Sequence, residues 1–332
     1  MIIIGVCLAL IVAIIYLSFF APYSRFDEPK SVNIDRDDNV DSILAKIDTI
    51  GHSLCSCGFS ILAKHSGYDE NIRTGHYVIK PGEMTFTIFR RLKNGKQTPV
   101  RITIPQVRTI DRLAEELSKK MMMTSGELTA LLTSESFCRK FDLDTTTVIS
   151  LFIPNNYEFY WDTPAEKFME RMSKESKEFW TKDRLSKAEG LNLSPVEVIT
   201  LASIIDEETA NNAEKPMIAG MYYNRLTVGM PLQADPTVKF AMKNFEARRV
   251  YRNWLTYDSP YNTYLYPGLP PGPIRVASVA GIDAVLNLVP HSYLYMCAKE
   301  DFSGTHNFAT TYAEHQKNAQ KYSKALNERG IE

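Results

Sequence analysis

The sequence predicts an α+β protein built from three successive parts. An uncharged apolar run from Ile2 to Ala21 is long enough to cross a bilayer of about 30 Å as a helix. A small α/β unit follows between Ser31 and Gly95, where short strand patterns alternate with amphipathic helix patterns. From about residue 99 onward, longer helices and a few strands indicate a mixed α/β domain. A chain of 332 residues has room for about two domains after the apolar run.

The apolar N-terminus favours a retained membrane anchor over a cleaved signal peptide. A signal peptide normally begins with basic residues, has a shorter apolar run and ends at a small-residue cleavage site. No basic residue precedes this run, and Ser18-Phe19-Phe20-Ala21-Pro22 is a poor cleavage site. The orientation stays open on charge alone, because Arg25 and Lys30 are balanced by Asp27 and Glu28.

The residues between the anchor and the first unit, 22 to 41, are polar and acidic and predict a spacer off the membrane. The elements expected in chain order are a strand at 31–34, helices at 40–50 and 59–64, a strand at 75–79, a helix at 85–93, a strand at 100–104, helices at 109–121 and 127–134, an aromatic loop at 151–161, helices at 164–180, 195–209 and 217–226, a loop at 231–237, helices at 238–242 and 276–288, a strand at 291–298 and a closing helix at 311–329.

Charge and cysteine content limit the functional classes. The net charge is −1 and no basic block occurs, which argues against nucleic acid as the main partner. The five cysteines lack metal-ligand spacing, and the closest two are too near in sequence for an easy mutual disulfide. They are Cys7, Cys55, Cys57, Cys138 and Cys297. We therefore expect unpaired packing cysteines, no metal site and no cofactor.

One predicted helix carries the candidate acid. Ser194 is a good N-cap and Pro195 fits the first helical position. Three apolar residues and one glutamate then follow the spacing of a single helix face, namely Leu201, Ile204, Ile205 and Glu208. A carboxyl held against apolar walls has a raised pKa, as a general acid needs. Asp206 and Glu207 point to the other side. The alternative is an ordinary solvated glutamate at a helix end.

Several motifs occur together between residue 100 and the C-terminus. They are Ala202–Thr209 (ASIIDEET), Tyr223–Leu226 (YNRL), Gly229–Thr237 (GMPLQADPT), Tyr261–Tyr264 (YNTY) and Gly268–Pro273 (GLPPGP). In this order they resemble the YceG-like endolytic murein transglycosylase family. The departures are Asp206 in place of the usual glutamate, Ala234 in place of serine or threonine, and Asn155-Asn156 in place of Asp-Thr.

The resemblance implies a membrane anchor at residues 1–21, a spacer and LysM-like subdomain at 22–98, and a catalytic domain at 99–332. It implies an enzyme without cofactor or metal, a lyase that cleaves the MurNAc–GlcNAc bond inside nascent glycan strands. The products carry 1,6-anhydro-MurNAc ends, and cleavage ends glycan elongation. The implied partners are peptidoglycan strands, the inner (cytoplasmic) membrane and peptidoglycan synthases, with the catalytic domain extracytoplasmic (periplasmic).

The family's catalytic glutamate precedes the threonine of a Glu-Thr pair, which is Glu208 here. The resemblance also implies a set of substrate-binding residues: Asn224, Gln233, Asp235, Tyr261, Asn262 and Thr263. Each of these could instead be a turn or cap residue. We interpret Asp235 as orienting substrate or fixing its loop, because Asp-Pro favours the start of a turn, so a single carboxylate carries the reaction.

Two other functions compete with the enzyme. The first is a membrane-tethered peptidoglycan-binding scaffold with a degenerate site, which the intact Glu208 argues against. The second is a pyridoxal-phosphate lyase, which fits poorly with a membrane anchor and with the lack of an identifiable cofactor lysine.

Overall fold

The computed structural model describes residues 2–23, 26–50, 57–247 and 249–329. The chain divides into two compact units. Unit 1 contains residues 1–102, 118–123 and 156–164, and unit 2 contains residues 103–117, 124–155 and 165–332. The described part is a mixed α and β structure with three separate two-stranded sheets, which confirms the predicted α+β class.

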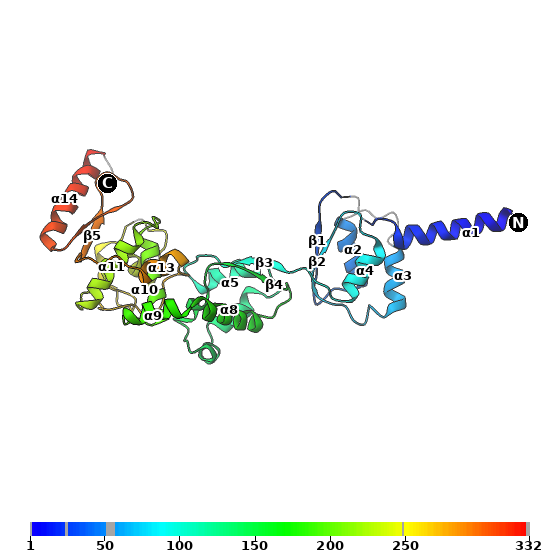
Figure 1. Cartoon of the computed structure of the whole chain (residues 1–332), viewed down its shortest axis with the longest axis horizontal. Helices are drawn as coiled ribbons and strands as arrows, with labels where there is room; N and C mark the ends of the chain where they lie inside the picture. The colour runs from blue at the N-terminus through cyan, green and yellow to red at the C-terminus, as the bar shows by residue number, and fades with distance from the viewer. Residues whose placement is uncertain (1, 24–25, 51–56, 248, 330–332) are drawn as a thin grey trace. The chain divides into compact units, whose positions relative to one another are not determined.

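Unit 1 begins with the apolar helix α1 (Ile2–Ile15), which continues as a π-helix, η1 (Tyr16–Phe20). Together they are long and apolar enough to span a membrane. No side chain of α1 is buried, and the helix extends away from the rest of unit 1 (Figure 1).

The end of the apolar segment packs into unit 1 instead of leading into a free spacer. Ser18 is buried beside Gly58, where an added Cβ would lie 2.0 Å from the Ser18 carbonyl oxygen. Tyr23 is buried in the core of unit 1, and its N–H donates to the Glu83 carbonyl at 2.8 Å. The predicted spacer at residues 22–41 is therefore wrong for Tyr23, which belongs to the folded unit, whereas the strand predicted at 31–34 is present from Lys30 to Ile34.

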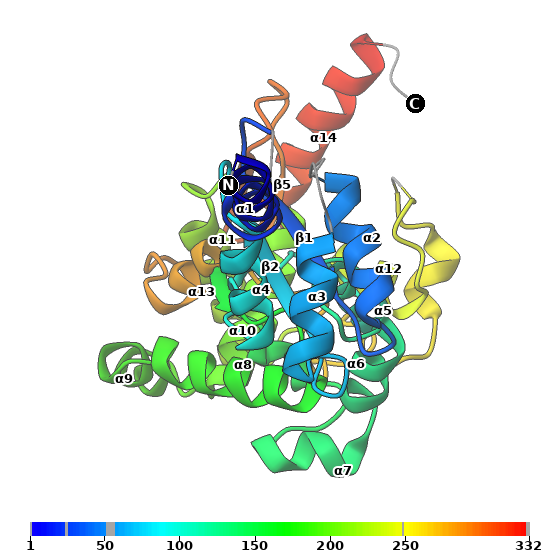
Figure 2. The ribbon, with the colours of Figure 1, turned by 90° about the vertical axis from the view of Figure 1, so that its right-hand side faces the viewer.

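The centre of unit 1 is an antiparallel pair of strands, β1 (Lys30–Ile34) and β2 (Gly75–Ile79), in which Val32 lies opposite Tyr77. Helices α2 (Val40–Ile50), α3 (Cys57–Ser66) and α4 (Thr85–Lys93) pack with it, and α2 and α3 run side by side in Figure 2. Phe59, Tyr68 and Phe89 form a buried aromatic cluster with edge-on ring contacts. The sequence predicted the two strands and three helices, but not the aromatic cluster.

Strand β3 (Val100–Thr103) pairs with β4 (Asn156–Phe159). The remaining elements belong mainly to unit 2. They are α5 (Ile110–Ser118), α6 (Ser125–Leu132), α7 (Glu135–Cys138), η2 (Arg139–Phe141), η3 (Val148–Leu151), α8 (Ala165–Phe179), α9 (Lys182–Gly190), α10 (Pro195–Glu208), α11 (Lys215–Thr227), α12 (Asp235–Ala241), η4 (Arg252–Thr256), α13 (Val279–Leu286), β5 (Tyr295–Ala298), β6 (His306–Ala309) and α14 (Tyr312–Glu328).

Helix α10 is the central element of unit 2. It contacts α9, α11, α12 and α13, and Figure 1 shows it among the ribbons of α9, α11 and α13. All residues from Val198 to Ile205 are buried, so this helix is enclosed on every side over two turns. Such a helix loses the one-sided pattern of a surface helix.

Some local predictions are wrong. The aromatic segment predicted as a loop contains strand β4, because alternate residues Tyr157 and Phe159 are buried. Helix α12 begins at Asp235, inside the predicted loop. Helix α9 and strand β6 were not predicted. Cys57 is disulfide-bonded, contrary to the expected free thiol. Its neighbour Cys55 lies outside the described residues, whereas Cys7, Cys138 and Cys297 are free.

Candidate active site

The sequence around Ser194 fixes where α10 begins. The Ser194 side chain accepts a hydrogen bond from the Glu197 N–H, and the Glu197 carboxylate accepts one from the Ser194 N–H at 2.8 Å. This capping box, with Pro195 at the first turn, satisfies donors that the helix leaves unpaired. Because the cap fixes where α10 begins and the middle of the helix is buried, its last turn has a defined orientation about the helix axis. This turn carries three consecutive carboxylates.

Glu208 is the last residue of α10 and is partly buried. Its Oε1 accepts a hydrogen bond from the Tyr222 hydroxyl at 2.7 Å. Tyr222 lies on α11 and is itself buried. Burial raises the pKa of this tyrosine far above its usual range. Its hydroxyl therefore stays protonated and can donate a hydrogen bond to the carboxyl. The hydrogen bond occupies one carboxyl oxygen and leaves the other for a ligand.

The pKa of Glu208 is raised above its ordinary value. The largest cause is desolvation, and the negative charge of Asp235 acts in the same direction. The Tyr222 hydrogen bond and the electrostatic influence of His306 and Lys239 oppose the rise without cancelling it. Glu208 also lies at the C-terminal end of a helix, where the macrodipole disfavours negative charge. The site therefore favours a protonated carboxyl, the form that can donate a proton.

Glu208 lines a cavity of about 240 Å³. The walls come from α10, α11, the 231–235 loop and the β5–β6 hairpin. The lining residues are Glu208, Met221, Tyr222, Arg225, Leu232, Gln233, Asp235, Tyr264, Met296, Cys297, Ala298 and His306. Buried Arg225 donates to the carbonyl oxygens of Leu232 and Leu294, each at 2.6 Å, and so joins the loop to the hairpin.

Gln233, from the loop before α12, and Asp235, the first residue of α12, reach the same cavity. The Tyr264 hydroxyl donates to the Asp235 carboxylate at 2.6 Å, which fixes its direction. Gln233 has a φ of 50°, in the left-handed region that non-glycine residues seldom adopt. Its N–H donates to the Thr263 carbonyl at 3.0 Å, and this contact holds the unusual backbone in place. Strained residues of this kind often occur at functional sites.

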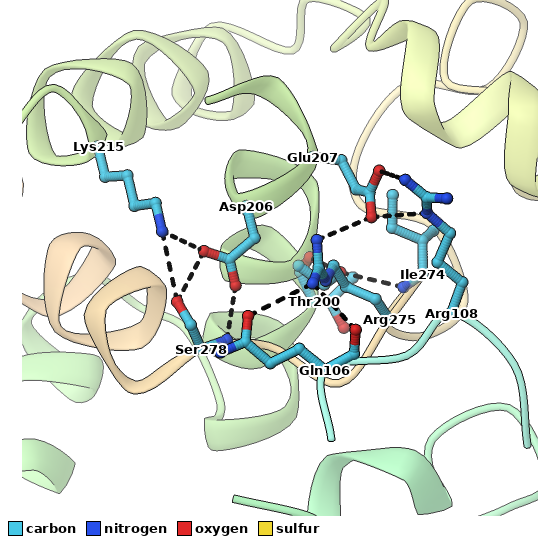
Figure 3. Close-up of polar contacts among 10 residues, drawn as sticks. Gln106, Arg108, Thr200, Asp206, Glu207, Lys215, Ile274, Arg275 and Ser278 are labelled. Atoms are coloured by element: carbon cyan, nitrogen blue, oxygen red, sulfur yellow. Dashed lines mark hydrogen bonds and ion pairs between the residues drawn. The ribbon is translucent and has the colours of Figure 1, made fainter. Parts of the chain in front are cut away.

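The other two carboxylates of the last turn are neutralised separately (Figure 3). Asp206 accepts hydrogen bonds from Lys215 Nζ at 2.7 Å and from the Ser278 N–H at 2.6 Å. Glu207 accepts from Arg108 Nε and Nη2, both at 2.8 Å, and from Arg275 Nη1 at 2.9 Å. Glu208 differs from both because its direct partner is a neutral hydroxyl.

A family model described as the YceG-like family matches residues 32–321. The chain belongs to the YceG-like family. It is 30% identical over 304 residues to the endolytic murein transglycosylase of Bacillus subtilis, with 87% of this chain and 82% of the relative aligned. It is 26% identical to the protein of that name from Streptococcus pneumoniae, covering 88% of this chain and 58% of the relative.

A solved structure with the same fold comes from Listeria monocytogenes and is described as a yceG-like protein. It matches 88% of this chain, and 99% of its own chain is aligned, with a TM-score of 0.58 and 26% identity. The mixed fold of this YceG-like protein is therefore the family's fold. The LysM-like nature of unit 1 and the predicted boundaries at residues 21 and 98 stay predictions.

Of the residues predicted to bind substrate in this YceG-like protein, Gln233 and Asp235 line the Glu208 cavity. The other four do not line it and make internal contacts. Asn224 Nδ2 donates to the His291 and Tyr293 carbonyls, and Asn262 Nδ2 donates to the Leu255 and Tyr257 carbonyls. Thr263 Oγ1 accepts from the Ala234 N–H, and the Tyr261 ring packs 4.8 Å from that of Phe240. Their contact with substrate stays a prediction.

The structure adds cavity residues that sequence reasoning did not select, chiefly Tyr222, Arg225 and Tyr264. The last two lie within the quoted motifs, and Tyr222 directly precedes one of them. His306 lines the cavity while its N–H and Nδ1 lie within hydrogen-bond distance of the Glu214 carboxylate. Among the described residues, no group of three or more His, Cys, Asp and Glu side chains could hold a metal ion.

Proposed function

We propose that this protein is an endolytic peptidoglycan transglycosylase in which Glu208 acts first as acid and then as base. The observation that carries the proposal is the environment of Glu208, a carboxyl with raised pKa at the wall of a cavity. The names of the relatives support the substrate class.

In the first step Glu208 donates its proton to the oxygen that links MurNAc C1 to the next GlcNAc. The C1–O bond breaks, and the leaving sugar departs with a hydroxyl. The carboxylate that results is stabilised by the Tyr222 hydroxyl, already 2.7 Å away. Positive charge develops at the sugar C1, and the nearby carboxylates of Glu208 and Asp235 stabilise it.

In the second step the Glu208 carboxylate accepts the proton of the C6 hydroxyl of the same MurNAc. The C6 oxygen bonds to C1 and closes the 1,6-anhydro ring, so no water is consumed. Because the nucleophile belongs to the substrate, its proximity supplies much of the rate. Asp235, held by Tyr264, orients the sugar in this scheme, and Gln233 offers an amide for hydrogen bonding.

We also infer that α1 and η1 anchor the protein in the cytoplasmic membrane with unit 2 outside the cell or in the periplasm. Support comes from the fully exposed apolar surface of α1 and from its continuity with unit 1. With Ser18 packed against Gly58, the anchor and unit 1 form one body, and the LysM-like unit would rest on the membrane surface. This position would keep the enzyme near newly made strands and their synthases.

The test is digestion of purified peptidoglycan sacculi by the full-length protein in detergent, with products measured by mass. Wild type should release fragments with anhydro-MurNAc ends, and Glu208→Gln should lose about 10²–10⁴ in rate while keeping its fold, because the amide cannot donate the proton. Glu170→Gln, at an exposed glutamate of α8 that pairs with Lys167, is the matched control and should keep activity. Unchanged activity of Glu208→Gln would contradict the assignment. Binding without cleavage by wild type would favour the scaffold alternative.

A further inference from the structure

A second groove lies on the other side of the last turn of α10 from the Glu208 cavity. It consists of two adjoining hollows of about 160 Å³ and 530 Å³ that share Arg108, Glu207 and Phe245. We propose that this groove binds a carboxylate of the stem peptide carried by the glycan strand. The inference rests on the proposed function and adds a subsite to it.

Arg108 is the group that a ligand can reach. Its side chain is 43% exposed, and its Nε and Nη2 atoms pair with both oxygens of Glu207. Nη1 is the third nitrogen of the same planar guanidinium, and it makes no hydrogen bond to the described residues. The Phe245 ring lies 5.4 Å from its centre. Arg108 is therefore held in one orientation with a free donor edge, which suits a planar carboxylate.

Glu207 does not cancel the positive charge of the groove. Arg275 also pairs with Glu207 at 2.9 Å, and its Nη2 donates to the Gln106 carbonyl at 3.1 Å. The charged lining residues are Arg108, Arg112, Lys239 and Arg275 against Glu207 and Glu246, four positive and two negative. Arg112 is already paired with Glu115 and Glu116, so the remaining lining charges leave a surplus of one positive charge. This surplus favours an anion, and Glu207 serves to position the arginines.

The groove is close to the reaction site along the chain and in space. Glu207 precedes Glu208, and α12 contributes Asp235 to the Glu208 cavity but Pro236 and Lys239 to the groove. The positive charge of Lys239 also influences Glu208. A ligand that fills the Glu208 cavity can therefore extend into the groove past the first turn of α12.

The chemistry of the substrate identifies the ligand. The sugar rings carry hydroxyl and acetamido groups, which are uncharged. A stem peptide attached to MurNAc supplies carboxylates and apolar side chains on the same strand. The groove offers a guanidinium beside the aromatic rings of Phe240 and Phe245, which matches an acidic peptide better than a neutral sugar.

The test is a cycle that changes Arg108 and the substrate carboxylates separately and together. The enzymes are full-length wild type and Arg108→Gln, with Arg139→Gln as a control because Arg139 is an exposed arginine paired with Glu135 outside the groove. The substrates are uncross-linked strands, the same strands with carboxylates converted to methylamides, and strands freed of peptide whose exposed lactyl carboxylates are likewise converted to methylamides. Release of anhydro ends gives kcat/KM for each combination.

Arg108→Gln should lower kcat/KM about tenfold on strands with free carboxylates, the usual size of a lost hydrogen bond to a charged group. Amidation should cause a similar loss for wild type and for Arg139→Gln, and no further loss for Arg108→Gln. Two results would overturn the subsite. One is that the losses in kcat/KM from Arg108→Gln and from amidation multiply when both changes are made. The other is that Arg108→Gln lowers kcat/KM as much on peptide-free strands as on strands with free carboxylates. Because wild type should still cleave peptide-free strands, inactivity on all three substrates would instead contradict the proposed function.

Discussion

Replacement of Lys215 by methionine tests how the last turn of α10 is held. Lys215 Nζ lies 2.7 Å from Asp206 Oδ1, and the two side chains are only 6% and 2% exposed. Asp206 keeps two hydrogen bonds from Ser278 when the lysine is lost. The variant therefore leaves a partly satisfied carboxylate with little access to water.

The expected loss follows from this burial. Removal of one partner of a buried ion pair typically costs about 3–5 kcal/mol, because the other charge stays buried without compensation. For a domain of about 200 residues this corresponds to a fall in Tm of about 6–20 °C. Because Asp206 keeps its hydrogen bonds from Ser278, we expect a loss of stability near the lower end of this range. Lys215→Met combined with Asp206→Asn should recover part of it, since the second change removes the stranded charge.

The assay is urea unfolding of wild type, both single variants and the double variant, followed by circular dichroism. Lys187→Met is the matched control, because its ion pair with Asp183 is exposed and should contribute less than about 1 kcal/mol. A Lys215→Met loss no larger than that of the control would refute the reasoning. Strict additivity of the two single changes would refute it as well.

Three further predictions concern the acid and the anchor. Glu208→Gln should raise Tm at pH 7, because burial raises the pKa of Glu208 in the folded protein and its ionisation then destabilises the fold as pH rises through that pKa. Below pH 4 the carboxyl is protonated in both the folded and the unfolded state, so the variant should not raise Tm there. Tyr222→Phe should move the alkaline limb of the pH–rate profile to higher pH, because the Tyr222 hydrogen bond lowers the pKa of Glu208. Asp235→Asn should move it to lower pH, because the Asp235 charge raises that pKa. A shift of both variants in the same direction would contradict these opposite effects. Deletion of residues 1–15 should leave unit 1 more heat-stable than deletion of 1–21, because η1 packs on α3 and α4.

Local sequence patterns predicted much of the fold because the physical cause is local. The helix at 40–50 and the strand at 75–79 have the predicted bounds, since periodic burial and turn residues determine them. Ser194 and Pro195 correctly indicated the start of α10, and Leu201, Ile204 and Ile205 are buried as expected. The helix is however buried on all sides from Val198 to Ile205, where the sequence predicted one apolar face. Strand β4 was missed because its partner β3 lies about 50 residues earlier in the sequence.

The candidate site was only partly predictable for the same reason. Helical spacing singled out Glu208, and the motifs included Gln233 and Asp235. Pairing across elements could not be read from spacing, so Tyr222 as the donor to Glu208 was missed. Asp206 and Glu207 were expected only to face the other way. The structure shows that Glu207 is paired with Arg108 and Arg275 from distant segments. Asp206 is paired with Lys215 and also accepts hydrogen bonds from the distant Ser278.

The central claim is that one carboxyl, Glu208, performs both proton transfers. Digestion of sacculi in water labelled with heavy oxygen tests it most directly. The account predicts new muramyl ends that are one water lighter than hydrolysed ends and contain no solvent oxygen. Reducing ends that carry the label would contradict it and indicate a hydrolase with Asp235, which lines the same cavity, as the base that activates water.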